Sequence, residues 1–425
     1  MPNRSKAPKI HEIRDVVLPR PLVHRLDNGI PVYEIHMGVQ DVLKVEVIFQ
    51  AGRPFEAVPM VSRATASLLR EGTAHRSGAE IAEVVDFFGG TLSSQGSLDH
   101  ITVTLYCLTR HFDALAPLLT DVLTEPSFPE DELKAFINRN KQRLQVDLTR
   151  NDIVAYRLIT ECIYGPTHPY GYNSTPELYE ALTRDDLQKH FRDHLIGANC
   201  QIFVSGKTND AVISRLNAEL GKALPKGVPS VPRLDGMGAL SGKLHQPHSD
   251  TVQTAIRLGR RLFARDHPDS NGLFVLNTIL GGYFGSRLMT NIREEKGYTY
   301  NIYSSLDPMQ YDGYFYVGTE VSNEFAKRAL DEIYREMEIL QKKPVGKAEL
   351  GMVRNYLMGN FLTMLDGPFN LAEVIRNYLS EGLPLESFEE MVRTVRQIDA
   401  AQLMELANKY FNPSEMWEVI VGNPV

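Results

Sequence analysis

Two histidines four residues apart, His190 and His194, have a spacing that could serve metal chemistry. On a helix both imidazoles would point to one side and could hold a divalent ion, with Asp193 between them as a base. This acid is shorter than the glutamate usual in such motifs. A second pair, His245 and His248, lies in a segment rich in proline and glycine, where we expect solvated side chains.

The string NIREEKGYTY offers a different chemistry, because Arg293 is followed seven residues later by Tyr300. An arginine fork can hold a peptide carbonyl or carboxylate, and a tyrosine hydroxyl can donate to a developing oxyanion. Alternatively, Arg293 pairs with a neighbouring acid and Tyr300 packs in a strand. Gly281 and Gly282, just upstream, either allow a tight turn and close packing or contact a substrate.

Composition excludes several classes of protein. The chain has 425 residues, of which 43% are hydrophobic and 23% charged, with a net charge of -8 spread along the sequence. Basic residues form no run with interleaved aromatics, so we expect no nucleic-acid partner. No apolar stretch approaches the ~18 residues needed to cross a bilayer, so we expect no membrane span.

The cellular setting is inferred from the N-terminus and the cysteines. The opening residues, 1–21, lack the apolar stretch of a secretory signal. Cys107, Cys162 and Cys200 lie far apart in apolar segments, which suits neither a disulfide framework nor a C-x-x-C site. A reducing compartment follows, and we expect a cytoplasmic protein.

The elements that must position these residues occur twice along the chain. Residues 186–206 align without a gap to residues 402–422, each as an amphipathic helix, a turn and a strand ending at glycine. Earlier strands also correspond, with residues 44–52 matching 251–259. Each half therefore predicts an α+β domain with helices packed on one face of a mostly antiparallel sheet.

The expected domains are residues 1–221 and 245–425, joined by a linker of residues 222–244. The linker contains three prolines and four glycines and no apolar period. Such a segment is typical of an exposed connection between domains and could work as a hinge.

This tandem of αβ domains resembles the pitrilysin or insulinase family of zinc peptidases, including the processing peptidases. The resemblance covers nearly everything after Leu22, through strings such as HRLDNGIPV, AGRPFE, HPYG and LTRDDL, and most specifically through the string that contains Arg293 and Tyr300. It implies that the two domains form half of a clamshell around a substrate chamber.

Active members of that family carry an inverted zinc motif, H-x-x-E-H, and a more distant glutamate ligand. Aligning the glycine and threonine that follow the motif with residues 72–73 places Arg63 and Ser67 at the histidine positions. Ala66 then stands where the catalytic glutamate belongs, and the distal ligand falls near Gln145. A neutral amide is a poor zinc ligand. We therefore expect no catalytic residue and no metal bound by this chain.

The resemblance implies that the substrate grip is kept, with Arg293, Tyr300 and the glycines 281 and 282 binding a peptide. The helix containing His190 and His194 comes last in its domain, unlike the motif helix, so we expect a solvated face there. The sequence thus predicts a non-catalytic, substrate-handling subunit of a heteromeric zinc peptidase, inactive alone. Its expected partner is a homologous zinc-bearing chain, and the substrate is a peptide or unfolded polypeptide.

Two other functions stay open at this point. The chain could be a structural core subunit of a larger assembly with no peptidase role. It could also be an active metallopeptidase with a relocated site, which would require His190 and His194 to bind metal. A homodimer of the chain alone is also left open.

Overall fold

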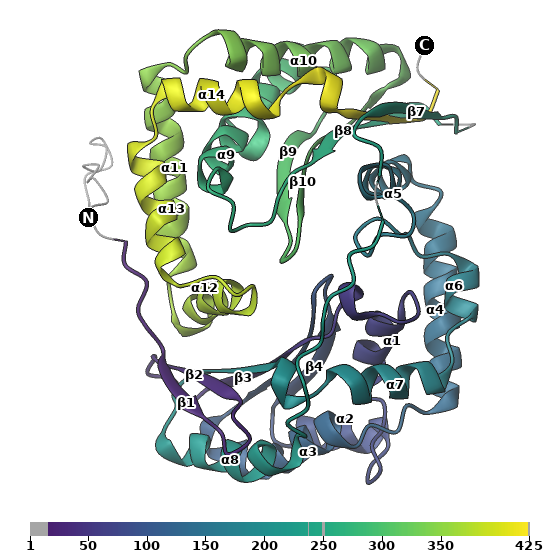
Figure 1. The fold of residues 1–425 in the computed structure, drawn as a ribbon, viewed down its shortest axis with the longest axis vertical. Coiled ribbons are helices and arrows are strands. Elements are labelled where there is room, and N and C mark those ends of the chain that lie inside the picture. Colours follow the sequence, from purple (N-terminus) through teal and green to yellow (C-terminus); the bar gives the residue numbers. More distant parts are fainter. Residues whose placement is uncertain (1–15, 237, 249–250, 424–425) are drawn as a thin grey trace, which may run out of the picture.

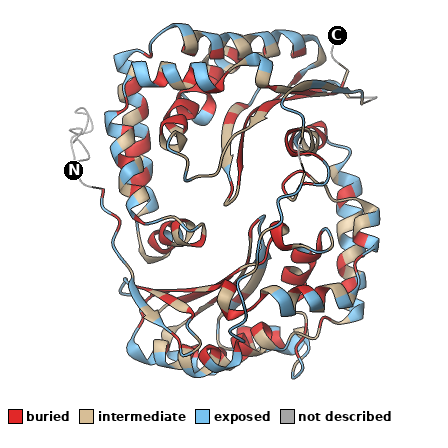
Figure 2. Cartoon of the chain, in the orientation of Figure 1, coloured by how far each residue is buried: buried red, intermediate tan, exposed pale blue. Residues whose placement is uncertain are grey.

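The computed structural model describes residues 16–236, 238–248 and 251–423, so the N-terminal segment used above to argue against export lies mostly outside it. Two β-sheets face one another across the molecule, each flanked by helices (Figure 1). Buried residues follow the inward sides of the helices and both sheets, as Figure 2 shows. The structure therefore confirms the α+β class and the clamshell arrangement.

The first sheet has the strand order β1-β2-β6-β3-β5-β4. All of its neighbouring strands are antiparallel except the parallel pair β2 and β6. Its strands are β1 Leu22–Arg25, β2 Pro31–His36, β3 Leu43–Gln50, β4 Thr91–Gly96, β5 His100–Cys107 and β6 Cys200–Gly206.

The second sheet repeats this plan in the order β7-β11-β8-β10-β9, again with one parallel pair, β7 and β11. The counterparts of β2, β6, β3, β5 and β4 are β7, β11, β8, β10 and β9. The strands are β7 Gly242–Gln246, β8 Gln253–Arg261, β9 Ile302–Pro308, β10 Gly313–Ser322 and β11 Trp417–Val421.

The helices also follow the repeat. Those of the first half are α1 Val61–Leu68, α2 Gly78–Phe87, α3 Phe112–Thr124, α4 Glu130–Asp147, α5 Asn151–Tyr164, α6 Pro176–Glu180, α7 Arg184–His194 and α8 Asp210–Ala223. Those of the second half are α9 Ser270–Asn277, the π-helical segments η4 Thr278–Gly282 and η5 Met289–Glu295, α10 Ala326–Lys342, α11 Lys347–Met364, α12 Pro368–Ser380, α13 Glu386–Gln397 and α14 Ala400–Tyr410. No helix in the described ranges is both long and apolar enough to cross a bilayer.

The helices α7 and α14 show how the sequence repeat becomes a structural one. Thr183 caps α7 in a capping box with Asp186, and Asp399 caps α14 in the same way with Gln402. Each box satisfies backbone N–H groups that the first helical turn would otherwise leave unbonded. The gapless alignment of the two segments therefore reflects the same helix start, turn and closing strand.

Each sheet is covered on its outer face by helices of its own half and on its inner face by a helix of the other half. Helix α5 of the first half packs on β8 and β11 of the second sheet, while α12 of the second half packs on β6 and β2 of the first. Between the two sheets, α5 and α12 lie on opposite sides of the molecule (Figure 1). This exchange of helices joins the halves and leaves the inner sheet faces only partly covered.

The connection between the halves differs slightly from the expected linker. Helix α8 continues to Ala223 and β7 begins at Gly242, so the described residues of the connection outside helices and strands are 224–236 and 238–241. The segment is bonded to both halves, since Arg233 N donates to Pro54 O at 2.6 Å and Trp417 Nε1 to Ala239 O at 2.8 Å.

Candidate functional site

Helix α1 has the positions where the zinc motif would lie, and its side chains have structural partners instead. Arg63 is exposed and donates from Nη2 to Asn140 Oδ1 of α4 at 3.3 Å. Ser67 Oγ donates back to the Arg63 carbonyl at 2.8 Å. Ala66 is fully buried against Gly96 of β4. A Cβ atom added to Gly96 would lie only 3.3 Å from the Cβ of Ala66. A guanidinium, a methyl group and a bonded hydroxyl cannot form a zinc site.

Gln145, near which the distal ligand is expected, is exposed on α4. A different α4 side chain, Asn140, is hydrogen-bonded to Arg63 of α1 and lies more than one helical turn earlier. Among the residues that the structure describes, no three His, Cys, Asp or Glu side chains are grouped to hold a metal ion. The zinc of the family therefore does not fit the residues present.

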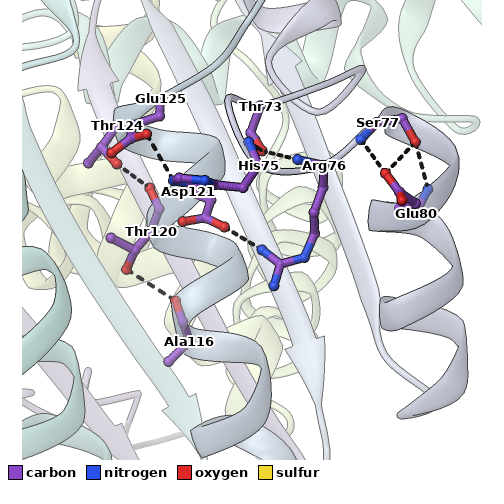
Figure 3. Close-up of polar contacts among 10 residues, drawn as sticks. All are labelled: Thr73, His75, Arg76, Ser77, Glu80, Ala116, Thr120, Asp121, Thr124 and Glu125. Atoms are coloured by element: carbon purple, nitrogen blue, oxygen red, sulfur yellow. Dashed lines mark hydrogen bonds and ion pairs between the residues drawn. The ribbon is translucent and has the colours of Figure 1, made fainter.

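The loop after α1, which fixes the register of the motif, is fastened to α3 (Figure 3). Thr73 Oγ1 accepts hydrogen bonds from His75 N at 3.2 Å and Arg76 N at 3.1 Å. Arg76 then forms an ion pair with Asp121, and His75 Nε2 lies 3.1 Å from Glu125 Oε2. The glycine and threonine at residues 72–73 are thus a rigid anchor for the end of α1.

The start of α1 is held by Glu56, whose importance the sequence did not reveal. Its half-buried carboxylate accepts hydrogen bonds from Met60 N at 3.3 Å, Ser62 N at 3.0 Å and the Tyr172 hydroxyl at 2.6 Å. Burial raises the pKa of Glu56, while the bonds from Ser62 and Tyr172 oppose that rise. Glu56 therefore serves as the missing N-cap of α1, because Met60 at the cap position offers no side-chain acceptor.

The prediction of a solvated face for His190 and His194 is wrong. His190 is only 4% exposed, with Nε2 2.9 Å from the Ala51 carbonyl, and His194 is half-buried, with Nδ1 2.7 Å from Ser230 Oγ. Burial lowers the pKa of His190 to about 4, and the charge of His194 adds to this effect. The helix packs against α1, so His190 is a core residue and His194 lies at the edge of the same contact. Ala51 is remote from His190 in the sequence, so no local sequence pattern could predict this contact.

The other histidine pair is also bonded. His245 lies in β7, exposed, with Nε2 3.0 Å from the Gly422 carbonyl. His248 is half-buried and bonded to Asn151 at the start of α5. The expected solvation therefore holds in part for His245 and fails for His248.

The structure leaves both members of the predicted grip accessible. Arg293 lies in η5 with its guanidinium 4.6 Å from the Phe284 ring centroid, and its nearest acid is Glu294 at 3.8 Å. Tyr300 precedes β9 and is 93% exposed, so it is not packed within a strand. The arginine can still donate hydrogen bonds to a ligand, and the phenol is open to one.

A half-buried polar cluster positions the segment that contains Arg293. Asn291 Nδ2 donates to Glu332 Oε2 at 3.0 Å and to Glu336 Oε1 at 2.7 Å, both on α10. Lys296 Nζ donates to Asn291 Oδ1 at 2.8 Å and lies 3.2 Å from Glu332. Burial raises the pKa of Glu336. These bonds tie Asn291, within η5, and Lys296, just after it, to α10, and Arg293 lies between them.

The two glycines of the predicted grip have different surroundings. A Cβ at Gly281 would lie 2.5 Å from Ser304 N of β9, so glycine is required there for close packing. Gly282, at the end of η4, is exposed. The structure gives Gly281 a packing role and leaves Gly282 accessible.

A polar cavity of about 260 Å³ lies beside Tyr300. It is lined by Asp152 of α5, by Arg257 of β8 and by Glu320 of β10. Arg257 is buried, and its Nη2 donates to the Asp152 carbonyl at 3.3 Å. The first turn of α5 therefore forms one wall of the space next to Tyr300, so residues from both halves meet there.

Comparison with known proteins agrees with this fold. The model of the family described as "Insulinase (Peptidase family M16)" matches residues 62–163, and that described as "Peptidase M16 inactive domain" matches residues 181–357. A crystal structure of a peptidase M16 inactive domain from Pseudomonas fluorescens superposes with a TM-score of 0.87 and 24% identity, covering 95% of this chain and 98% of that one. A protease from Helicobacter pylori gives a TM-score of 0.88 at 18% identity, covering 96% and 100%.

Curated relatives carry contrasting names. The uncharacterized zinc protease YmxG of Bacillus subtilis is 24% identical over 347 residues, which is 80% of this chain and 83% of that protein. The non-peptidase homolog YmxG of Helicobacter pylori is 21% identical over 410 residues, 95% of this chain and 92% of that protein. The fold and the altered α1 define a zinc-peptidase scaffold without its metal donors. This chain belongs to peptidase family M16, as an inactive homologue of its zinc proteases.

Proposed function

We propose that this chain is the non-catalytic, substrate-handling subunit of a heteromeric zinc peptidase that cleaves peptides or unfolded polypeptides. One observation carries the proposal: α1 lacks every zinc donor, while Arg293 and Tyr300 remain accessible in the other half. A homologous chain with an intact motif would supply the zinc and the base. This chain would supply donors to the peptide and part of the chamber wall.

The chemistry of the two grip residues supports this division of labour. The Arg293 guanidinium has one weak contact with Glu294 and a ring contact with Phe284, so its remaining N–H groups can bind a peptide carbonyl. The Tyr300 hydroxyl can donate to an oxygen on which charge develops. Both are useful only if a nucleophile is provided from outside this chain.

An extended peptide could also pair with an edge strand. Strands β4 and β9 end the two described sheets, and each faces the region between the halves. Main-chain pairing at an edge holds a backbone without reading its sequence. A subunit that accepts varied peptides would gain from such a contact.

The alternative of a purely structural subunit is kept as the second candidate. The relative called a non-peptidase homolog favours it, because that name assigns no proteolytic role. The relocated-site alternative has less support, since His190 is buried and occupied by the Ala51 carbonyl. Zinc analysis of the purified chain tests it, and one tightly held equivalent would revive it.

We place the protein in the cytoplasm as part of the same proposal. Its three cysteines, Cys107, Cys162 and Cys200, are free. Burial raises the pKa of the Cys107 thiol to about 12 and that of Cys162 to about 11. Thiols in this state are poor nucleophiles and suit a reducing compartment.

The decisive experiment mixes this chain with a homologous chain bearing an intact H-x-x-E-H motif from the same organism. Hydrolysis of a quenched-fluorescence peptide is measured for each chain alone and for the mixture, with Arg293→Ala, Tyr300→Phe and the exposed control Arg328→Ala. We expect the mixture to outpace the partner alone, and each grip variant to lower that rate about tenfold or more. Equal rates for Arg293→Ala, Tyr300→Phe and Arg328→Ala would leave the structural alternative.

A further inference from the structure

An apolar cavity of about 300 Å³ lies in the second half, away from Arg293 and Tyr300. Its walls come from α9, α11 and α13, from the β9 and β10 ends, and from α12. The side chains that define it are almost all apolar. They include Leu273, Phe274, Leu306, Phe361, Phe388 and Met391.

A polar cavity of about 440 Å³ adjoins it between the two halves. Asp99, just before β5, and His100, its first residue, line it on one side, and Ser380 and Glu381 at the end of α12 line it on another. Pro308 at the end of β9 lines both cavities. The two spaces are therefore neighbours that share a strand end and a helix.

An ion pair marks the boundary between them. Arg265 lines the apolar cavity and Glu381 the polar one, with Nη1 3.1 Å from Oε2. The guanidinium also lies 4.4 Å from the Tyr378 ring centroid, which keeps it at the cavity wall. A donor and an acceptor thus stand side by side where an apolar pocket meets a polar one.

We infer that the two cavities together form a pocket for an extended peptide, in which a large apolar side chain such as Phe, Leu or Met enters the apolar cavity. The backbone next to that side chain lies in the polar cavity, with a carbonyl facing Arg265 and an N–H facing Glu381. This inference rests on the proposed peptide-handling function and gives it a substrate class.

The charges favour a peptide over a fatty acid. A free carboxylate entering from the polar side would find both nearby guanidinium groups already paired, Arg265 with Glu381 and Arg376 with Glu46. It would also meet the carboxylate of Asp99, which disfavours a second negative charge. A peptide group is neutral and presents both a donor and an acceptor. The small volume and mostly apolar lining of the first cavity fit one apolar side chain. Ligand pockets are typically apolar in this way, with a few polar groups that fix the orientation of the ligand.

Direct binding to the full chain tests the pocket. Three blocked, fluorescein-labelled nonapeptides of glycine and serine, with a central Phe, Leu or Ser, are titrated and followed by fluorescence anisotropy. We expect the Phe and Leu peptides to bind about 10- to 100-fold more tightly than the Ser peptide, from the burial of one large side chain.

Filling the cavity should remove that preference. Leu306→Trp replaces a leucine side chain with a bulkier indole ring inside the apolar cavity. Leu362→Trp makes the same change on α11 outside both cavities and serves as the control. We expect the preference for Phe to vanish in the first variant and to persist in the second. Circular dichroism verifies folding, and Ser270→Phe, which narrows the same cavity from α9, is used if Leu306→Trp does not fold.

Three results would overturn the pocket. They are equal affinities for the Phe, Leu and Ser peptides, a preference that survives Leu306→Trp in folded protein, and decanoate binding that Leu306→Trp abolishes while no peptide competes. These results are independent of the peptidase assay, in which the effect of Arg293→Ala on the rate of the mixture is measured. A lost Arg293 effect with a persistent Phe preference would instead contradict the zinc-subunit proposal and leave the pocket standing.

Discussion

Arg376 of α12 reaches the first sheet and places Nη1 2.7 Å from Oε1 of Glu46, a β3 residue that is 1% exposed. Lys44 Nζ lies 2.9 Å from the other oxygen of the same carboxylate. A charge buried this deeply is tolerable only when it is paired. The contact between the halves therefore depends on a carboxylate that needs partners from both of them.

Removing Arg376 should be costly for that reason. We expect Arg376→Ala to lower the free energy of unfolding by about 3 kcal/mol, because it leaves Glu46 short of a partner. The exposed Arg393→Ala should change it by less than about 0.5 kcal/mol. Urea unfolding followed by circular dichroism measures both, and similar losses in the two variants would contradict the importance of the pair.

His190 should make stability depend on pH. Its folded pKa is lowered to about 4 by burial, below the ordinary value of 6.5, so the unfolded chain binds more protons between these values. Stability is then retained above pH 6.5 and is lost as pH falls toward 4. The full loss from this group is about 3 kcal/mol.

The matched variants are His190→Gln and the exposed His75→Gln. Unfolding free energies measured between pH 7 and pH 4.5 should fall less steeply in His190→Gln than in the wild type, and equally steeply in His75→Gln. Identical slopes for the wild type and His190→Gln would show that His190 is not buried in its neutral form.

Asn291 should hold the segment η5, and with it Arg293, in place. Asn291→Ala removes the donor shared by Glu332 and Glu336, and leaves the half-buried Glu336 carboxylate without that bond. We expect a loss of about 1–3 kcal/mol in local stability and faster amide exchange across residues 289–298. Hydrogen exchange read by mass spectrometry checks this, with exchange in α7 as the internal control. Unchanged protection of η5 would contradict the role of these hydrogen bonds, and would leave the stacking of Tyr298 on Phe325 as the contact that holds the segment.

Zinc donors can be restored to decide which α4 position faces α1. The variant Arg63→His/Ser67→His/Asn140→Glu should bind zinc, because Asn140 already contacts Arg63. The variant Arg63→His/Ser67→His/Gln145→Glu should bind zinc about 10- to 100-fold more weakly, because only its two histidines would reach the metal. Competition with a chromogenic chelator gives both affinities. The reverse order would place the distal position at Gln145.

Local patterns predicted the elements well but not their neighbours. The alignment of residues 186–206 with 402–422 gave the same helices and strands that the structure has, because capping and amphipathic spacing are local. Amphipathicity also marks a buried side of α5 and α12, yet it cannot say which sheet covers it. The exchange of these helices between the halves was therefore not foreseen.

The candidate site shows the same division. The loss of donors at Arg63 and Ser67 could be predicted, since it depends on residue types in a fixed register. The error at His190 arose because its partner, the Ala51 carbonyl, is remote in the sequence. The accessibility of Tyr300 likewise depends on where β9 begins, which residue patterns locate only roughly.

The exchange of α5 and α12 has a consequence for how such a chain can be divided. Half of it, expressed alone, would expose the apolar inner side of its sheet and keep a helix with no surface to cover. Two copies of one half could cover both surfaces by exchanging helices across a twofold axis. In the present polypeptide the exchange takes place within one chain, so its halves should unfold together in a single transition rather than one after the other.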